Sequence, residues 1–236
     1  IAHPLSADQQ FRSLDPTFAP RPPVGANLRA ALEDLLDQVF AHQFPAHPAF
    51  DTEIKPAVIR KVWQEVERAI RAPNQRELVA DPATRRLVRS VVNPCRLGQM
   101  GETHLLIEPH WSSRFAQCEA RESLATLTVA DLRRWIDDPV PMGLPQEVQN
   151  LIVLAFAALT NRRFIQRGGP FEPSVDQMPN ELELRQQTLP DATQWEKAIE
   201  RASQVFGLVV PETLNAANVG RLIAEVREAA VSHRDA

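Results

Sequence analysis

The sequence contains no tyrosine, and only two cysteines and eight glycines among its 236 residues. Cys95 and Cys118 lie far apart and form no C-x-x-C pair, so neither a disulfide framework nor a structural zinc site is expected. The glycines form no G-x-G-x-x-G or G-x-x-x-x-G-K-S/T pattern, and Pro170 removes a backbone N–H directly after Gly168 and Gly169. The sequence therefore predicts no phosphate-binding loop and no cofactor.

Long apolar runs and a strong charge of one sign are also missing. No apolar segment approaches the roughly 18 residues of a transmembrane helix, and the start of the chain has no secretory signal pattern. The 26 basic and 30 acidic residues nearly balance, so the whole chain does not attract nucleic acid or membranes. We therefore expect a protein of the reducing cytoplasm that does not bind membranes, and any contact with nucleic acid has to be local.

The chain contains instead many segments with helical periodicity and capping residues. The predicted helices span 26–40, 56–71, 82–92, 111–121, 128–138, 146–160, 191–206 and 213–226. The segment 146–160 is apolar almost throughout after its first turn, so this helix has to be enclosed by its neighbours. Short strands are predicted at 104–108, 163–166 and 182–187. The expected fold is mainly α, a multi-helical domain with a few short strands.

The order of the elements between 128 and 187 resembles a helix-turn-helix followed by a wing. The turn VPMGLP joins two helices, and two expected strands follow on either side of a loop rich in glycine and proline. Such an order also arises in unrelated folds. A winged-helix-like unit is therefore one interpretation of this region.

Proline content and periodicity divide the chain into four parts. Residues 1–25 carry five prolines and are expected to form an extended arm or linker. A helical subdomain with basic helices is expected over 26–125, and a subdomain with the helix-turn-helix and wing-like order over 126–230. The tail, 231–236, is expected to be frayed. Because the chain starts with Ile1 and not with methionine, we expect it to be a piece of a longer protein.

The side chains that could carry chemistry form no recognisable catalytic pattern. No serine or cysteine lies in a nucleophile elbow or beside an evident base. The histidine pairs His42/His47 and His104/His110 have carboxylates nearby but match no zinc spacing, and we interpret them as structural. The sequence thus predicts no catalytic residue and no metal site, and an enzyme would need a polar pocket that the sequence does not indicate.

Local positive charge is the one feature that suggests a ligand. Residues 54–92 contain nine cations and four acids. Arg85 and Arg89 stand one helical turn apart, with Arg86 beside them and Arg96 just beyond the helix, a spacing that suits contacts along a phosphate backbone. A solvated helix face in an arginine-rich protein has the same appearance, and this is the simpler interpretation.

A second basic group consists of Arg162, Arg163 and Arg167, where a wing would touch DNA. Arg162 and Arg163 also follow an apolar helix, where cations complement the helix dipole. If both arginine groups share one exposed face, DNA binding is favoured. Burial of these arginines, or pairing with Glu and Asp, favours a scaffold.

Several phrases of the sequence resemble one known family. They are HPAF after an aromatic loop, VVNPCRLGQMGE, GLPQEVQNLIVLAFAALTNRRF followed by a glycine pair, and WEKAIERASQVFG. Over most of residues 26–230 the chain is similar to the C-terminal part of the large P-loop ATPases of bacteriophage-exclusion systems, the PglY and BrxC type. The resemblance implies a bacterial phage-defence protein whose ATPase module lies elsewhere. None of the phrases is a catalytic motif, so no catalytic residue is carried over.

Two functions follow from these observations. The first is a non-catalytic interaction module of a larger phage-defence ATPase, whose partners are other protein domains or subunits of a defence complex. The alternative is a DNA-binding module that contacts phosphates of double-stranded DNA through the two arginine groups. A small stand-alone enzyme of unknown reaction is a third alternative.

Overall fold

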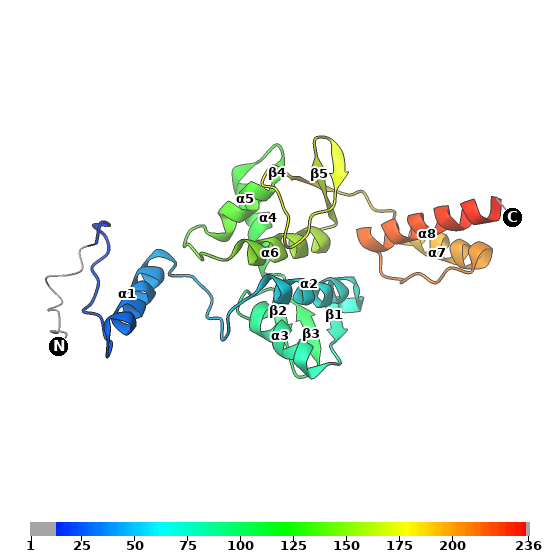
Figure 1. Cartoon of the computed structure of the whole chain (residues 1–236). Helices are drawn as coiled ribbons and strands as arrows, with labels where there is room; N and C mark the ends of the chain where they lie inside the picture. Colours follow the sequence, from blue (N-terminus) through cyan, green and yellow to red (C-terminus); the bar gives the residue numbers. More distant parts are fainter. Residues whose placement is uncertain (1–12, 235–236) are drawn as a thin grey trace. The chain divides into compact units, whose positions relative to one another are not determined.

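The structure is a computed structural model that describes residues 13–234 (Figure 1). Contacts divide the chain into two compact units, of which one comprises Ile1–Pro48 and Ile136–Leu144 and the other Ala49–Trp135 and Pro145–Ala236. The boundaries expected near residues 25, 125 and 230 stay predictions. The mainly α fold is confirmed, because helices predominate and the strands of the described part form two small antiparallel sheets.

The first unit is built on α1 (Leu28–Gln43), which begins where the side chain of Asn27 accepts a hydrogen bond from the backbone N–H of Ala30. Residues 13–25 form no helix or strand and follow one flank of α1. The first twelve residues of the expected arm lie outside the described residues. The segment after α1 is connected to the segment 136–144 by a contact of 2.7 Å between His47 Nδ1 and the carbonyl oxygen of Met142.

The second unit contains a three-stranded antiparallel sheet covered by two helices. The strands are β1 (Arg76–Leu78), β2 (Gly98–Met100) and β3 (His104–Ile107), in the order β1-β3-β2. The helices are α2 (Pro56–Arg71) and α3 (Pro82–Val92), and a 3-10 turn, η2 (Pro73–Gln75), leads into β1. Both helices have the predicted bounds, since Pro56 and the Asp81 cap are local start signals.

No strand was predicted before residue 104, but residues 98–100 form β2. A Cβ atom on Gly98 would lie 2.2 Å from the carbonyl oxygen of Leu106 on the neighbouring strand. The glycine therefore marks a close approach of two strands and not only a chain reversal.

The second unit also contains a four-stranded antiparallel sheet and three further helices. The strands are β4 (Leu127–Thr128), β5 (Arg162–Gln166), β6 (Gly169–Phe171) and β7 (Glu183–Gln186), in the order β4-β7-β5-β6. The helices are α4 (His110–Glu122), α5 (Val129–Ile136) and α6 (Gln146–Leu159). The strands predicted at 163–166 and 182–187 are confirmed, while β6 lies in the segment that was expected to be a loop.

Helix α6 lies at the centre of the second unit, as its apolar sequence predicted. Nine of its residues are buried, and it packs against α2, α4 and β5 (Figure 1). Phe156 of α6 meets Phe115 of α4 edge to face, with ring centroids 5.0 Å apart. Aromatic pairs in this geometry contribute about 0.5–1.5 kcal/mol beyond their buried area.

The chain continues into a helical hairpin of α7 (Ala192–Phe206) and α8 (Ala216–Arg234). Asp191 and Gln194 form the capping box that begins α7, and Gly207, with φ of 66°, ends it. The hairpin has a small core of its own, in which four residues are buried: Trp195, Ala202, Val210 and Leu222. Of the tail that we expected to be frayed, 231–234 continue α8 and the last two residues lie outside the described residues.

Candidate functional site

The first arginine group lies on and beside α3, and part of it holds the fold together. Arg85 Nη1 donates to the carbonyl oxygens of Val79 and Ala80, at 2.9 and 2.8 Å. Arg89 donates from Nε to the carbonyl of Met100 at 3.2 Å and from Nη2 to that of Gly101 at 2.5 Å. These guanidinium groups therefore tie α3 to the segment before it and to the β2–β3 turn.

Arg86 and Arg96 are exposed, as is Arg89, but they make none of these internal hydrogen bonds. Arg96 lies in the turn after α3 with φ of 53°. Burial lowers the pKa of His110, and the nearby charge of Arg96 lowers it further. Neither the Arg86 nor the Arg96 guanidinium has a hydrogen bond or ion pair within the part of the chain that the structure describes. These two residues are consequently the members of the group that are available to a phosphate.

The second arginine group is divided between the two faces of β5. Arg162 Nη2 donates to Glu119 Oε2 of α4 at 2.8 Å, and the guanidinium lies 5.4 Å from the centre of the Phe156 ring. Only 14% of the Arg162 side chain is exposed. Arg163, on the other face of the strand, is exposed and meets Gln187 Oε1 at 3.4 Å, and the exposed Arg167 begins the β5–β6 turn with φ of 49°.

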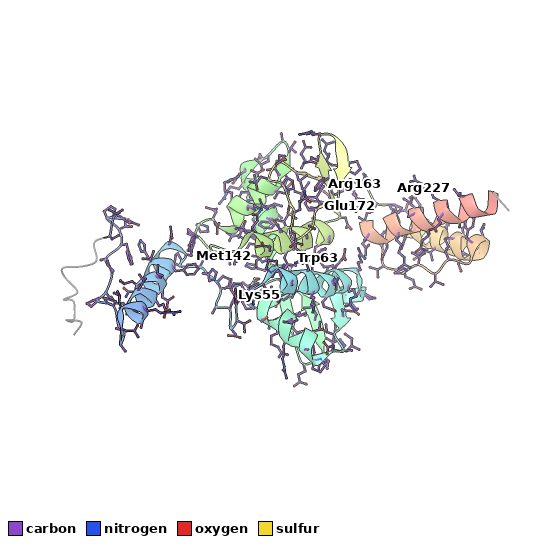
Figure 2. The ribbon with its side chains drawn as sticks, viewed as in Figure 1. Lys55, Trp63, Met142, Arg163, Glu172 and Arg227 are labelled. Atoms are coloured by element: carbon purple, nitrogen blue, oxygen red, sulfur yellow. The ribbon has the colours of Figure 1, made fainter. Side chains whose placement is uncertain are left out.

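The two groups do not share one face of the second unit. Helix α3 packs on α2, α2 packs on α6, and α6 packs on β5, so the α2–α6 pair lies between the groups. Figure 1 shows α3 and β5 at opposite ends of this arrangement, and Figure 2 labels Arg163, which lies near the start of β5. A contact of one duplex with all seven arginines is not favoured by this arrangement, and DNA binding by them stays a prediction.

The elements expected of a helix-turn-helix and wing occur in the expected order, as α5, α6 and the β5–β6 hairpin. The Thr128–Asp131 capping box at the start of α5 is also present, with the Asp131 N–H 3.3 Å from Thr128 Oγ1. However, α6 is enclosed by its neighbours, so its side chains cannot enter a DNA groove. The order of the elements alone does not establish a winged helix.

A partly buried polar network, which sequence reasoning missed, centres on Arg133 of α5. Its Nη2 donates to Asn150 Oδ1 at 2.6 Å and to the carbonyl of Met178 at 2.9 Å, and Nη1 donates to Asn180. Asn150 Nδ2 in turn donates to the carbonyl of Val175 at 2.8 Å. Among residues 13–234 no carboxylate pairs with this cation, and burial lowers the pKa of Arg133. This network fastens the β6–β7 loop to α5 and α6.

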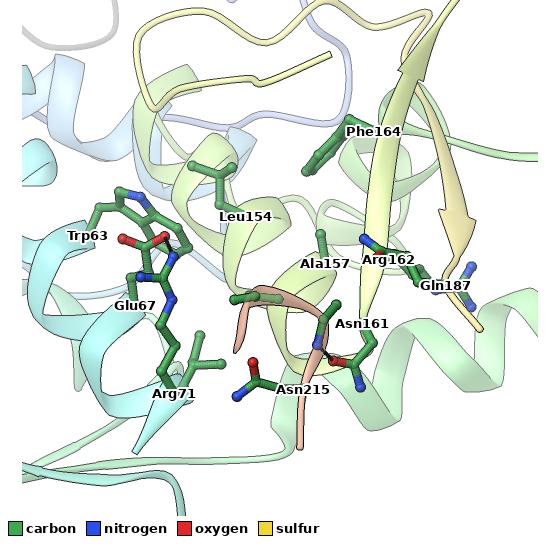
Figure 3. Close-up of a pocket in the computed structure, with 14 residues that line it drawn as sticks. Trp63, Glu67, Arg71, Leu154, Ala157, Asn161, Arg162, Phe164, Gln187 and Asn215 are labelled. Atoms are coloured by element: carbon green, nitrogen blue, oxygen red, sulfur yellow. Dashed lines mark hydrogen bonds and ion pairs between the residues drawn. The ribbon is translucent and has the colours of Figure 1, made fainter. Parts of the chain in front are cut away.

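A cavity of about 220 Å³ lies among α2, α6, β5 and the start of α8 (Figure 3). The Glu67–Arg71 ion pair, at 2.7 Å, forms part of its wall, and Asn161 Oδ1 accepts from the backbone N–H of Ala216 at 2.9 Å. Its lining contains no thiol, hydroxyl or imidazole group, and its one carboxylate is already paired. The cavity therefore offers no nucleophile with a free base beside it.

The two cysteines are buried, and His42 and His104 have structural partners. The Cys95 thiol is buried and free, and burial raises its pKa to about 12, so it is not an activated nucleophile. His42 lies 3.5 Å from Asp15, and His104 Nδ1 lies 2.9 Å from Thr103 Oγ1. Within residues 13–234 no group of three or more His, Cys, Asp or Glu side chains converges as metal ligands would.

Over residues 13–234, no helix has both the length and the apolar character needed to cross a membrane.

Comparison with known families assigns three successive segments of the chain to one protein. Residues 1–44 match the PglY fourth domain, residues 57–157 match the BREX system ATPase PglY protein 5th domain, and residues 199–236 match its 6th domain. No solved structure matches the chain. The matches confirm the resemblance found in the sequence. The chain therefore belongs to the PglY family of BREX system ATPases, and it is the part of a phage-defence protein that matches the fourth, fifth and sixth domains of PglY.

Proposed function

We propose that this region is a non-catalytic interaction module that mediates protein assembly of the defence ATPase in the bacterial cytoplasm. The observation that carries the proposal is the uneven distribution of exposed apolar side chains. Most of the large ones lie on α1 and on the α7–α8 hairpin: Leu28, Leu32, Leu36, Val39, Phe40, Val205, Val209, Ile223 and Val231. Helical faces of this kind are typical of protein-interaction surfaces.

The arrangement of the arginines also supports assembly over DNA binding. Arg85, Arg89 and Arg162 use guanidinium donors on carbonyl or carboxylate oxygens of the same unit. A residue whose donors are already used has less to offer a phosphate, since binding would first break those hydrogen bonds. Cytoplasmic location agrees with the two free cysteines, Cys95 and Cys118.

Assembly is tested by purifying the tagged parent ATPase from cells that carry its complete defence system. We expect Ile223→Glu and Val205→Glu, on the exposed face of the hairpin, to remove at least one co-purifying subunit of that system. Leu106→Glu, on the exposed face of β3, is the matched control and is expected to retain every subunit. If both hairpin variants retain the same subunits as the unchanged protein, assembly through the α7–α8 hairpin is excluded.

DNA binding remains the second candidate because Arg86, Arg96, Arg163 and Arg167 are exposed. Fluorescence anisotropy with a labelled duplex across a salt series tests it. The variants Arg86→Ala with Arg96→Ala, and Arg163→Ala with Arg167→Ala, leave the internal hydrogen bonds of the other arginines in place. Binding that weakens steeply with salt and falls in either double variant would favour DNA contact, and absence of binding at low salt would exclude it for this region.

A further inference from the structure

A groove runs between α7 and α8, within the second unit (Figure 1). It has a volume of about 410 Å³, and most of the side chains that line it are apolar, among them Val205, Ile223 and Val226. The lining also includes two arginines, Arg201 of α7 and Arg227 of α8, of which Figure 2 labels the second. We propose that this groove binds an acidic amphipathic helix of a separate partner protein. The proposal rests on the assembly function and names the class of partner.

The apolar side chains of the groove extend beyond the core that α7 and α8 share. In that core Ala202 and Leu222 are buried, and both also line the groove. Val205 and Ile223, which stand beside them, remain 67% and 46% exposed. A helix that placed an apolar face in the groove would bury these side chains, as amphipathic helices do in the grooves that bind them.

A glycine inside α8 stands where the fold itself requires none. Gly220 precedes Ile223 by three residues and Arg227 by seven, so the three share one side of the helix. Its φ is not positive, and a Cβ atom placed on it would have no other atom of the described chain within 4 Å. Glycine in a helix is less favourable than alanine, and its known advantage is that another backbone can approach closely. On the other wall Ala198 and Ala202 are also small, so a partner helix has room to lie close to both helices.

The charges at the groove are all of one sign. Arg201 and Arg227 line it from different helices, and no carboxylate is among its lining residues. Neither guanidinium has a hydrogen bond or an ion pair within residues 13–234. At about 100° per residue, the carboxylates of the two helices lie on other sides, away from the groove: Glu196, Glu200, Glu225 and Glu228. Carboxylates beside the apolar seam of a partner helix would therefore complement the two free cations.

The same features disfavour two other occupants. Two copies of this groove placed face to face would bring Arg201 and Arg227 against their own counterparts, which is unfavourable. A DNA duplex would accept contacts from both arginines through its phosphates but would leave Val205 and Ile223 without an apolar partner. An acidic helix satisfies both the cations and the apolar side chains.

Three synthetic amphipathic peptides of equal length serve as probes. The first has leucine at the seam and glutamate at the flanking positions, the second has lysine in place of the glutamates, and the third has alanine in place of the leucines. In fluorescence anisotropy with the complete 236-residue chain, we expect the leucine–glutamate peptide to bind at least about tenfold more tightly than either of the others. Equal binding of the lysine peptide would overturn the acidic class of partner. Equal binding of the alanine peptide would show that the attraction is only ionic and would overturn the groove as the site.

Charge variants test the role of the two arginines. We expect Arg201→Gln with Arg227→Gln to weaken binding of the leucine–glutamate peptide at least about tenfold and to reduce its dependence on salt. Arg201→Glu with Arg227→Glu should transfer the preference to the lysine peptide. Arg221→Gln is the matched control, because Arg221 is also exposed on α8 but is paired with Glu225 at 2.6 Å away from the groove. Circular dichroism verifies that each variant is folded, and an equal loss in Arg221→Gln would overturn the proposal.

Apolar variants test the location of the site. We expect Val205→Gln and Ile223→Gln each to weaken binding of the leucine–glutamate peptide, while Leu106→Gln, on the exposed face of β3, leaves it unchanged. Light scattering after size exclusion should give the mass of a monomer. A dimer that Ile223→Gln converts to a monomer would identify a second copy of the chain as the occupant and would overturn the proposal. Displacement of the peptide by duplex DNA at physiological salt would overturn it in favour of DNA.

Purification of the tagged parent ATPase separates this inference from the assembly function. We expect Arg201→Gln with Arg227→Gln to remove the same subunit that Ile223→Glu removes, while Arg221→Gln retains it. If Ile223→Glu removes a subunit and the double arginine variant retains it, the acidic class of partner is overturned and assembly through the hairpin stands. If Ile223→Glu itself retains every subunit, assembly through the hairpin and this inference fail together.

Discussion

Arg162 of β5 and Glu119 of α4 form an ion pair of 2.8 Å across the second unit. The arginine side chain is largely enclosed, and its guanidinium also lies over the Phe156 ring. A residue in these surroundings contributes to the free energy of unfolding more than an exposed surface cation does.

Replacing Arg162 with methionine should therefore destabilise the protein. We expect a loss of about 1–3 kcal/mol in urea unfolding, because the partly buried Glu119 carboxylate loses its partner. A double-mutant cycle with Glu119→Gln should return part of this loss as coupling energy. Arg163→Met, the exposed neighbour, is the control and should change stability by less than about 0.5 kcal/mol. Equal effects of the two changes would contradict the assignment.

Glu122 makes stability depend on acid pH. Its pKa is lowered to about 2 by hydrogen bonds, first from Arg134, at 2.9 and 2.6 Å, and then from Trp135 Nε1, at 2.8 Å. A carboxyl whose pKa is lower in the folded state stabilises the fold above its unfolded pKa of about 4.5, and this contribution is lost as pH falls toward 2.

The melting temperature, measured by circular dichroism between pH 2 and 6, should fall through this window. In Glu122→Gln the melting temperature at pH 6 should be lower and its decrease from pH 4.5 to 2 shallower. Glu102→Gln, an exposed residue of the β2–β3 turn, is the control and should retain the full decrease. An unchanged slope in Glu122→Gln would exclude this carboxyl as a source of the acid sensitivity.

Gly98 and Gly101 lie close together in the sequence but should tolerate alanine differently. A Cβ atom at Gly98 would lie 2.2 Å from the Leu106 carbonyl oxygen, whereas at Gly101 the nearest atom is the His104 carbonyl oxygen at 3.6 Å. Gly98→Ala should cost about 1–3 kcal/mol, because β2 and β3 have to move apart. Gly101→Ala should be close to neutral in the same urea titration, and similar costs for the two variants would contradict the strand contact.

The Cys95 thiol should be unreactive in the folded protein. Burial raises its pKa to about 12, so almost none is thiolate at pH 8. In a Cys118→Ala background, the reaction with Ellman's reagent should be at least roughly a hundredfold slower than in guanidinium chloride. A rate in the folded protein close to the denatured rate would place Cys95 at the surface.

The helices were predicted well from the sequence because their signals act over a few residues. Pro56 and the Asp81–Pro82 pair define where α2 and α3 begin, and Gly207 defines where α7 ends. The start of α8 was expected near Thr213 but lies at Ala216.

Strands and arginine roles were harder to predict because they depend on distant parts of the chain. A three-residue strand such as β6 has no periodicity of its own and exists through its pairing with β5. The partner of Arg162 lies 43 residues away, and nothing near Glu119 in the sequence indicates the pairing. The polar network of Arg133 likewise joins residues 17 to 47 positions apart.

The sequence by itself determined a mainly α fold, the enclosed position of α6 and the membership of the PglY family, because composition, capping and family phrases are local properties of the chain. Only the tertiary structure decided which side chains remain accessible. It engaged Arg85, Arg89 and Arg162 in internal contacts and left the groove between α7 and α8 open. Accessibility depends on which segments pack against a residue, and such contacts between distant segments are not encoded in the spacing of neighbouring residues.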